Sequence, residues 1–212
     1  MSFRERSERK TDLTQRAYST MVEITNWKVY DLEESVIACR NSMRTTPPEY
    51  TKEEFEKSLQ RAIKLAKTPS NFGEDNFLCG IRVSFDIKYP NYFSPELQRY
   101  HFLDIVSSSS KMHRLVQMDM DSCFNEYVTA QSKEQMKRLI HNYNEEKSYE
   151  NFMRVISNCP LGVELFMRCT TNYRALKNIY KQRKHHKLKE DWGAFCKFIE
   201  ELPYAKELII NS

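Results

Sequence analysis

The sequence predicts an α+β protein, a helix-rich single domain with a small antiparallel sheet. One segment, IRVSFDIKY (81–89), alternates strictly between apolar and polar residues, which is the pattern of a half-buried strand. Apolar residues at helical spacing and helix-start signals recur along most of the remaining chain. The 212 residues, of which 40% are hydrophobic and 12% aromatic, are enough to bury a substantial core in one domain.

The first 90 residues are expected to form a charged, flexible tail followed by two strands and two helices. In chain order these are the tail 1–20, a strand at 22–29, helices at 31–44 and 51–67, and the strand at 81–89, which Pro90 ends. Asp31 and Thr51 precede the two helices, and a glutamate follows three residues after each, which is the capping-box pattern. The domain itself is expected to span 21–212.

Five helices are expected in the rest of the chain, and a serine tract separates the first two. They cover about 94–103, 132–143, 152–156, 163–182 and 188–201. Ser94 followed by Pro95 predicts the first of these starts, because serine is a favoured N-cap and proline is favoured at the first helical position. Trp192 and Phe195 mark the buried face of the last helix.

The serine tract, Ser107–Ser110, admits two interpretations. It is either a polar loop or part of a cradle for an anion. Serine hydroxyls and backbone N–H groups, with a cation at Lys111, are the donors that a phosphate monoester needs. Arg99 and His101 lie two residues apart on the preceding segment and could reach a second anionic group.

A basic segment, TTNYRALKNIYKQRKHHKLKEDW (170–192), is the second candidate. From the residues alone it is either a solvated basic helix face or an anion site that includes Arg174 and Arg183. Asn172, at the start of the run, is either structural or functional. Binding of single-stranded nucleic acid by these lysines and nearby tyrosines is a third interpretation, which the modest formal net charge of +4 disfavours.

The composition disfavours several other classes of protein and site. The four glycines form neither a G-x-G-x-x-G motif nor a phosphate-binding P-loop. No apolar stretch approaches the ~20 residues of a membrane helix, so no membrane association is expected. The six cysteines lack C-x-x-C spacing, which favours reduced thiols in the cytoplasm. Asp119 and Asp121 lack further ligands at metal-loop positions, so no metal is expected.

Four segments of the sequence carry a further signal. They are IACRNSMRT (37–45), VSFDIKYP (83–90), the set Arg99, His101, Ser109 and Lys111, and the set Pro160, Asn172, Arg174, Leu176 and Arg183. In order and in spacing they resemble four motifs of the flavin-dependent thymidylate synthase family: A-A-R-x-S, the F-x-F-x-V-x-x-P strand, the R-H-R-x7-S-x-R signature, and L-P followed by N-x-R-x-L and a final arginine. The resemblance covers about residues 30–205.

The resemblance implies transfer of a methyl or hydroxymethyl group to a pyrimidine deoxynucleotide such as dUMP, with FAD as cofactor and methylenetetrahydrofolate as a possible carbon donor. By position, the residues implied in cofactor binding are Arg99, His101, Asn172 and Glu74. Those implied in substrate binding are Glu96, Ser109, Ser110, Lys111 and Arg183. Arg183 is also implied as catalytic, because it would stabilise charge that develops on the pyrimidine carbonyl. A homotetramer with its site between subunits is implied as well.

The sequence departs from the family at some of these positions. Tyr100, His101 and Lys111 replace the second, third and last residues of the signature, and lysine lacks the bidentate fork of arginine. Glu74 stands where the family has a flavin-contacting histidine. These departures support an alternative expectation, a catalytically degenerate homologue that acts as a nucleotide-binding or regulatory protein.

Overall fold

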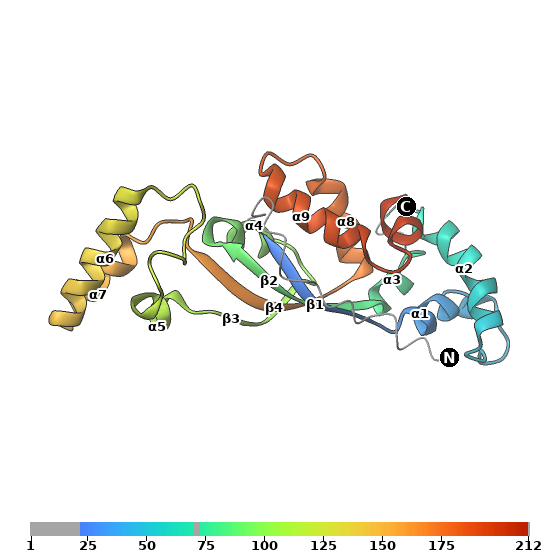
Figure 1. Cartoon of the computed structure of the whole chain (residues 1–212). Coiled ribbons are helices and arrows are strands. Elements are labelled where there is room, and N and C mark those ends of the chain that lie inside the picture. Colours follow the sequence, from blue (N-terminus) through green and yellow to red (C-terminus); the bar gives the residue numbers. More distant parts are fainter. Residues whose placement is uncertain (1–21, 70–72, 212) are drawn as a thin grey trace.

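The computed structural model describes residues 22–69 and 73–211. The elements are β1 (Glu23–Tyr30), α1 (Leu32–Ala38), η2 (Asn41–Met43), α2 (Lys52–Ala66), α3 (Phe77–Gly80), β2 (Arg82–Pro90), η3 (Asn91–Phe93), α4 (Ser94–Leu97), β3 (Asp104–Ser108), α5 (Lys111–Arg114), η4 (Leu115–Gln117), α6 (Ala130–Glu145), α7 (Tyr149–Ser157), β4 (Glu164–Asn172), α8 (Tyr173–Arg183), α9 (Lys189–Glu200) and η5 (Lys206–Ile210). The sheet occupies the middle of an elongated molecule, with α6 and α7 at one end and α1 and α2 at the other (Figure 1). None of the described helices is long and apolar enough to cross a membrane. The tail expected at 1–20 lies outside the described residues.

The sheet has four antiparallel strands in the order β1-β2-β4-β3. β2 and β4 pair without interruption, from Arg82 opposite Asn172 to Pro90 opposite Glu164. β3 pairs with the other edge of β4, and a shift of register interrupts this pairing near the middle of β3. β4 is therefore an inner strand, although it comes last in the sequence, and β3 is an edge strand.

Helices α8 and α9 cover one face of the sheet (Figure 1). Alternate side chains of β2 point toward them, and Val83, Phe85 and Ile87 are at most 1% exposed. The ring centroid of Phe85 lies 5.8 Å from that of Phe195 and 5.1 Å from that of Phe198, both on α9. These aromatic contacts form the centre of the main hydrophobic core.

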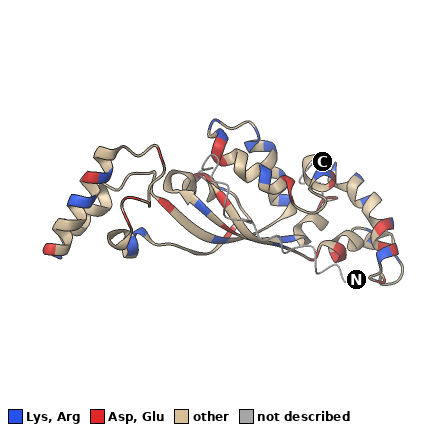
Figure 2. Ribbon diagram, viewed as in Figure 1, with Lys and Arg blue, Asp and Glu red and all other residues tan. Residues whose placement is uncertain are grey.

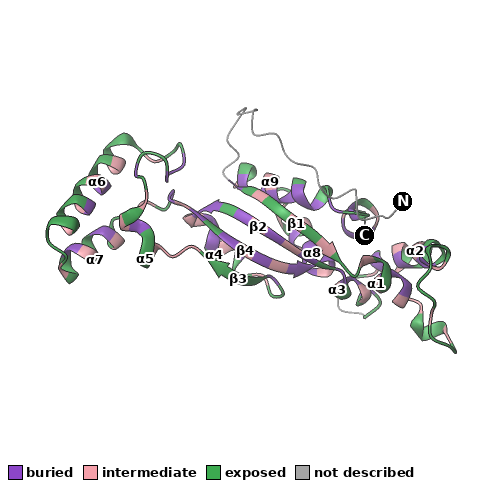
Figure 3. Ribbon diagram, turned by 60° about the horizontal axis from the view of Figure 1, so that its bottom comes forward, coloured by how far each residue is buried: buried purple, intermediate pink, exposed green. Residues whose placement is uncertain are grey.

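The opposite face of the sheet is open to solvent in a single chain. Its charged side chains pair between strands: Arg168 lies 3.0 Å from Asp86, and Lys88 lies 2.5 Å from Glu164. Phe166, on the same face of β4, is 66% exposed. β3 is exposed along its whole length (Figure 3).

A second, smaller hydrophobic cluster lies at the end of the molecule where α6 and α7 project. It contains Leu115, Met120, Cys123, Phe124, Met136, Ile140, Val155 and Val163. The helix predicted to start at Ser132 starts two residues earlier, because Thr129 is its cap and accepts a hydrogen bond from the Ser132 N–H at 3.2 Å. The helix predicted around 152–156 is confirmed as α7.

The prediction of one helix over 163–182 is wrong in its first half, which is β4. Leu165, Met167 and Cys169 point into the core and are at most 5% exposed, whereas Phe166 faces outward, so the segment has the period of a strand. Pairing on both edges satisfies the backbone of this segment, and the strand continues directly into α8 at Asn172.

Two other helix predictions need correction. The helix expected over 94–103 ends at Leu97, and Ser94 makes no side-chain cap because it is already helical. The helix expected over 31–44 ends at Ala38, and Asp31 adopts a left-handed conformation (φ 57°) without capping. By contrast, Thr51 caps α2 as predicted, and the strands at 22–29 and 81–89 and the helix at 188–201 are confirmed within two residues at each end.

We expect Phe85→Ala to lower the free energy of unfolding by about 3–5 kcal/mol, because it leaves a cavity where α9 packs on the sheet. Tyr149→Ala, at a position that is 79% exposed, is the control and should change this value by about 0.5 kcal/mol or less. Urea unfolding monitored by circular dichroism measures both. Equal losses in the two variants would contradict the assignment of the core.

Candidate functional site

Arg183, the residue predicted to be catalytic, lies at the end of α8 and is held by other residues of its own chain. One guanidinium nitrogen lies 2.8 Å from a carboxylate oxygen of Glu96, and Nε donates to the Tyr100 hydroxyl at 2.6 Å. The guanidinium also stacks on the Trp192 ring, 4.6 Å from its centroid. Because the side chain is 13% exposed, a ligand of Arg183 would have to compete with Glu96.

The contacts around Arg183 join α4 and the turn after it to α8 and α9. Glu96 is the predicted substrate residue on α4, and it also lies 4.0 Å from His186. Burial raises the pKa of the Tyr100 hydroxyl, and Arg183 lowers it in part. The phenol is therefore neutral at neutral pH and acts as an acceptor for Arg183. The sequence indicated Glu96 and Arg183 but not Tyr100 and Trp192, whose positions become adjacent only after folding.

The serine tract lines a groove of about 860 Å³ on the open face of the sheet. Ser107–Ser110, His113 and Arg114 form one side, and side chains of β2 and β4, among them Lys88 and Arg168, form the other. The groove therefore combines hydroxyl donors and cations with two carboxylates, because Asp86 and Glu164 also line it and pair with Arg168 and Lys88. Ser107 and Ser108 belong to β3, so the tract is not a simple polar loop, and its role as an anion cradle stays a prediction.

Ser109 continues the pairing of β3 with β4 beyond the end of the strand. Its N–H donates to the Phe166 carbonyl at 2.9 Å, and its hydroxyl accepts from the Phe166 N–H at 3.1 Å. This second bond fixes the hydroxyl oxygen and leaves its proton available for an anion. Ser110 and Lys111 follow directly at the start of α5. Ser109 and Ser110 thus line the groove, whereas Lys111 follows them in the chain and is not among the lining residues.

Two of the residues predicted to bind flavin, Arg99 and His101, lie near the opposite end of β3. The Thr171 hydroxyl donates to the Phe102 carbonyl at 2.8 Å, which brings the turn that carries Arg99 and His101 to the end of β4. Arg99 and His101 are exposed, and neither has a hydrogen bond or ion pair within the described part of the chain. Both side chains are therefore available to a ligand.

The other two predicted flavin residues are placed differently. Asn172 is 6% exposed, and its side-chain oxygen accepts from the Ala175 N–H at 2.9 Å. It is the N-cap of α8, so its structural interpretation holds. Glu74 is exposed in the loop before α3. That loop lies against α8, because Arg174 donates to the side-chain oxygen of Asn76 at 2.9 Å.

A buried ionic cluster lies beneath this loop. Asp75 is fully buried, 3.1 Å from Nε of Arg174 and 3.8 Å from Nζ of Lys177, which is also fully buried. The Lys177 ammonium donates to the carbonyls of Ala66 and Thr68 as well. Burial is the largest cause of the lowered pKa of Lys177. Sequence reasoning missed this cluster, because neither Asp75 nor Lys177 belongs to a motif.

The two predicted halves of the site do not meet within one chain. Arg99 and His101 lie near the Asp104 end of β3, and Ser109 follows its other end. Asp104 and Ser109 are five residues apart in an extended chain, which spans about 17 Å. Arg183 packs among the helices that cover the other face of the sheet and does not line the serine groove. Within one chain, Arg183 is therefore separated from the groove that Ser109 and Ser110 line, and the site between subunits that the resemblance implies stays a prediction. The binding roles of these residues stay predictions.

The chain has the fold of the flavin-dependent thymidylate synthases. The synthase ThyX from Helicobacter pylori, in complex with FAD and dUMP, is 17% identical with a TM-score of 0.67, and the match covers 89% of this chain and 97% of that one. A second structure of the same enzyme with FAD and dUMP is 18% identical, with a TM-score of 0.68 and coverage of 89% and 96%. The UMP/dUMP methylase PolB from Streptomyces cacaoi, bound with 5-Br dUMP, is 13% identical, with a TM-score of 0.57 and coverage of 90% and 92%. No family model and no curated protein matches the sequence.

We expect Asp75→Ala to lower the free energy of unfolding by about 3–5 kcal/mol at pH 7, because it leaves the buried ammonium of Lys177 without its carboxylate. Glu53→Ala, which removes one partner of an exposed ion pair with Lys57, is the control and should have little effect.

The loss in Asp75→Ala should also depend on pH. Because burial lowers the pKa of Lys177 below its ordinary value of 10.5, the unfolded chain binds this proton more tightly than the folded one. The cost in folding free energy of burying the charged Lys177 is therefore fully present below the pKa of Lys177 in the folded chain. It disappears as the pH rises from that value to 10.5, the pKa in the unfolded chain. Urea unfolding at pH 7 and pH 10 measures the difference, and a loss that is equal at both values would contradict the buried charge.

Proposed function

We propose that the protein transfers a one-carbon group to a pyrimidine deoxynucleotide such as dUMP, with FAD as cofactor. The serine groove is the observation that carries this proposal. It lies in a chain whose fold matches almost the whole length of a synthase that binds FAD and dUMP, and its hydroxyls and cations suit a phosphate monoester.

In this proposal the serine groove binds the nucleotide phosphate. The hydroxyls of Ser109 and Ser110 donate to phosphate oxygens, and Lys111 supplies a positive charge beside them. Lysine is a point charge without the planar fork of arginine. The direction of the phosphate therefore depends on the serine hydroxyls, of which Ser109 is held in place by the backbone of Phe166.

The residues at the other end of β3 fit part of an FAD molecule. Arg99 and His101 have exposed N–H donors that suit its diphosphate. Asn172 is committed to capping α8, and the carboxylate of Glu74 does not suit an anionic group. Bound FAD would supply the hydride that reduces the transferred carbon to a methyl group. Methylenetetrahydrofolate is the proposed carbon donor.

Arg183 is proposed to stabilise negative charge on the pyrimidine carbonyl. Because it does not line the groove of its own chain, it would reach a nucleotide that is bound to a second copy. Glu96 and Trp192 would hold the guanidinium until the ligand arrives, so that little side-chain entropy is lost on binding.

A second copy is the proposed cover for the open face of the sheet. Val106 of β3 is 62% exposed and Phe166 of β4 is 66% exposed, which places apolar side chains beside the serine groove. A second chain that covers this face would bury the apolar surface and would bring its own side chains to the serine groove. We therefore propose a homo-oligomer, with a tetramer as the form implied by the resemblance.

Binding of a nucleotide without catalysis is the second candidate function. One observation favours it: the charge of Arg183 is already paired with Glu96 and largely withdrawn from solvent. A chain of this kind would bind dUMP in the serine groove and would regulate or sequester it. Turnover distinguishes the two functions, because only the enzyme consumes dUMP.

The test of function is turnover of dUMP by the purified chain with reduced FAD and methylenetetrahydrofolate. We expect the purified chain to show flavin absorbance near 450 nm after FAD is added, and to form product from dUMP. Arg183→Ala should form no product. Lys111→Met should weaken dUMP binding about tenfold, the effect of losing one charge-assisted hydrogen bond. Lys133→Met, on α6 and away from the groove, is the matched control.

Three outcomes would count against the proposal. A chain that binds no FAD would contradict the proposed cofactor. Stabilisation by dUMP without turnover would support the second function. An unchanged dUMP affinity in Lys111→Met would contradict the position of the phosphate.

We expect Phe166→Asp to dissociate the oligomer, because it places a charge in the apolar surface that a second copy would cover. Size-exclusion chromatography with light scattering measures the mass. Met43→Asp, at an exposed position far from this surface (81% exposed), is the control and should leave the mass unchanged. A wild-type chain that is monomeric at micromolar concentration would contradict the shared site.

A further inference from the structure

A second cavity lies at the other end of the molecule, between the segment after α1 and helix α2. It has a volume of about 520 Å³. The residues that line it are Arg40, Met43, Lys57, Gln60, Arg61 and Lys64. Most of these side chains are cationic and none is acidic. The proposed chemistry of FAD and dUMP uses none of them, so the cavity has no assigned role.

The spacing of residues along α2 explains why one wall of the cavity is basic. Lys57, Gln60, Arg61 and Lys64 recur at helical spacing and therefore lie along one face of α2. The buried residues of the helix, Phe55, Ser58, Ala62 and Ala66, lie on another face and attach it to the rest of the molecule. Lysine and arginine positions along α2 are visible in Figure 2. The basic stripe is thus presented on a rigid element.

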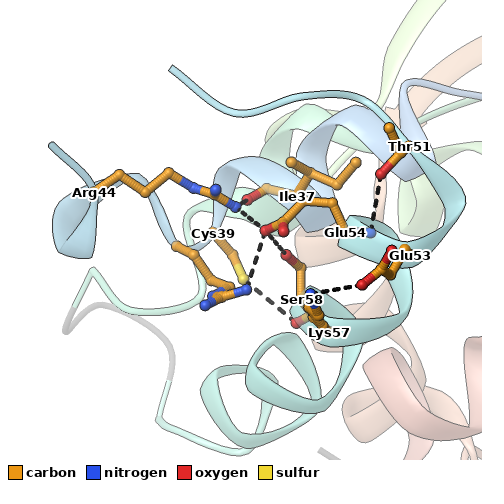
Figure 4. Close-up of polar contacts among 9 residues, drawn as sticks. Ile37, Cys39, Arg44, Thr51, Glu53, Glu54, Lys57 and Ser58 are labelled. Carbon is orange, nitrogen blue, oxygen red and sulfur yellow. Dashed lines mark hydrogen bonds and ion pairs between the residues drawn. The ribbon is translucent and has the colours of Figure 1, made fainter. Parts of the chain in front are cut away.

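Glu54 holds the other wall in position. Its carboxylate accepts from Arg40 at 3.0 Å and also from Arg44, and the Ser58 hydroxyl donates to it at 3.3 Å (Figure 4). The hydrogen bond from Arg44 is the main reason that the pKa of Glu54 lies below its usual range. The carboxylate therefore stays ionised, and it fixes the segment that carries Arg40 and Met43 against α2.

The charges around the cavity do not cancel. Glu54 is shared by Arg40 and Arg44, and Glu53 pairs with Lys57 at 2.8 Å. The side chains of Arg61 and Lys64 form no hydrogen bond or ion pair within the described residues. The four lining cations, together with Arg44 outside the lining, are thus set against two carboxylates, which leaves three positive charges in excess. Because like charges repel one another when the cavity is empty, a bound anion would stabilise this arrangement.

We propose that this cavity binds the triphosphate group of a soluble ligand, such as a nucleoside triphosphate or inorganic tripolyphosphate. The excess of three charges matches a ligand that carries three or more negative charges. The guanidinium groups of Arg40 and Arg61 suit phosphate oxygens, because their planar forks can donate two hydrogen bonds to one group. The volume lies within the range of small-molecule sites. This proposal does not depend on the proposed reaction at the serine groove.

The test is calorimetric titration of the full chain with tripolyphosphate at about 50 mM and 150 mM salt. We expect saturable binding of one tripolyphosphate per chain that weakens at the higher salt concentration. Arg61→Ala combined with Lys64→Ala should weaken it at least tenfold. Both side chains are exposed and form no ion pair in the described structure, so this double variant should fold.

Lys133→Ala combined with Arg138→Ala is the matched control. It removes one lysine and one arginine from α6, away from the cavity, and should change tripolyphosphate binding less than twofold. Affinity for dUMP should be the same in both double variants, which separates this site from the serine groove. A wild-type chain without saturable binding, or an equal loss in both variants, would overturn the proposal. Binding only to anionic lipid vesicles or to single-stranded oligonucleotides would overturn it as well.

Discussion

The pairing of β4 with β2 on one edge and with β3 on the other is the constraint on which the rest of the structure depends. It divides the sheet into a face covered by α8 and α9 and a face open to solvent. It also sets the positions of the candidate residues, because Ser109 pairs with Phe166 near one end of β4 and Asn172 caps α8 at the other. The backbone N–H and C=O groups on both edges of β4 are hydrogen-bonded to its neighbours. Ser109 and Asn172 therefore have little freedom to shift along the sheet.

The same constraint explains why the proposed site needs more than one chain. The serines that we propose as phosphate donors lie on the open face, whereas Arg183 lies among the helices on the covered face, paired with Glu96 and stacked on Trp192. Local contacts hold both Ser109 and Arg183 in place, so neither would move across the sheet without breaking them. A second copy over the open face would resolve the separation and would bury the exposed apolar side chains Val106 and Phe166.

Local patterns predicted the parts of the fold that local interactions determine. The strand at 81–89 has a strict alternation, and α2 has a threonine cap whose hydrogen bond forms within the same turn. β4 was missed because it continues into α8 without glycine or proline between them, so the segment 163–182 has no internal stop signal. The motifs supplied the candidate residues, but spacing along a chain does not say on which face of a sheet a side chain lies. The partners Tyr100 and Asp75 were missed because only tertiary contacts bring them to arginines.

Complementation between two inactive variants tests most directly whether the site is shared. One variant carries Lys111→Met with Ser109→Ala and lacks the phosphate donors; the other carries Arg183→Ala and lacks the guanidinium. If each site takes these groups from different chains, subunit exchange between the two variants creates intact sites, and dUMP turnover should reappear in the mixture. A mixture that exchanges subunits, as mass measurements can establish, and yet stays as inactive as its components would contradict a site assembled from two copies.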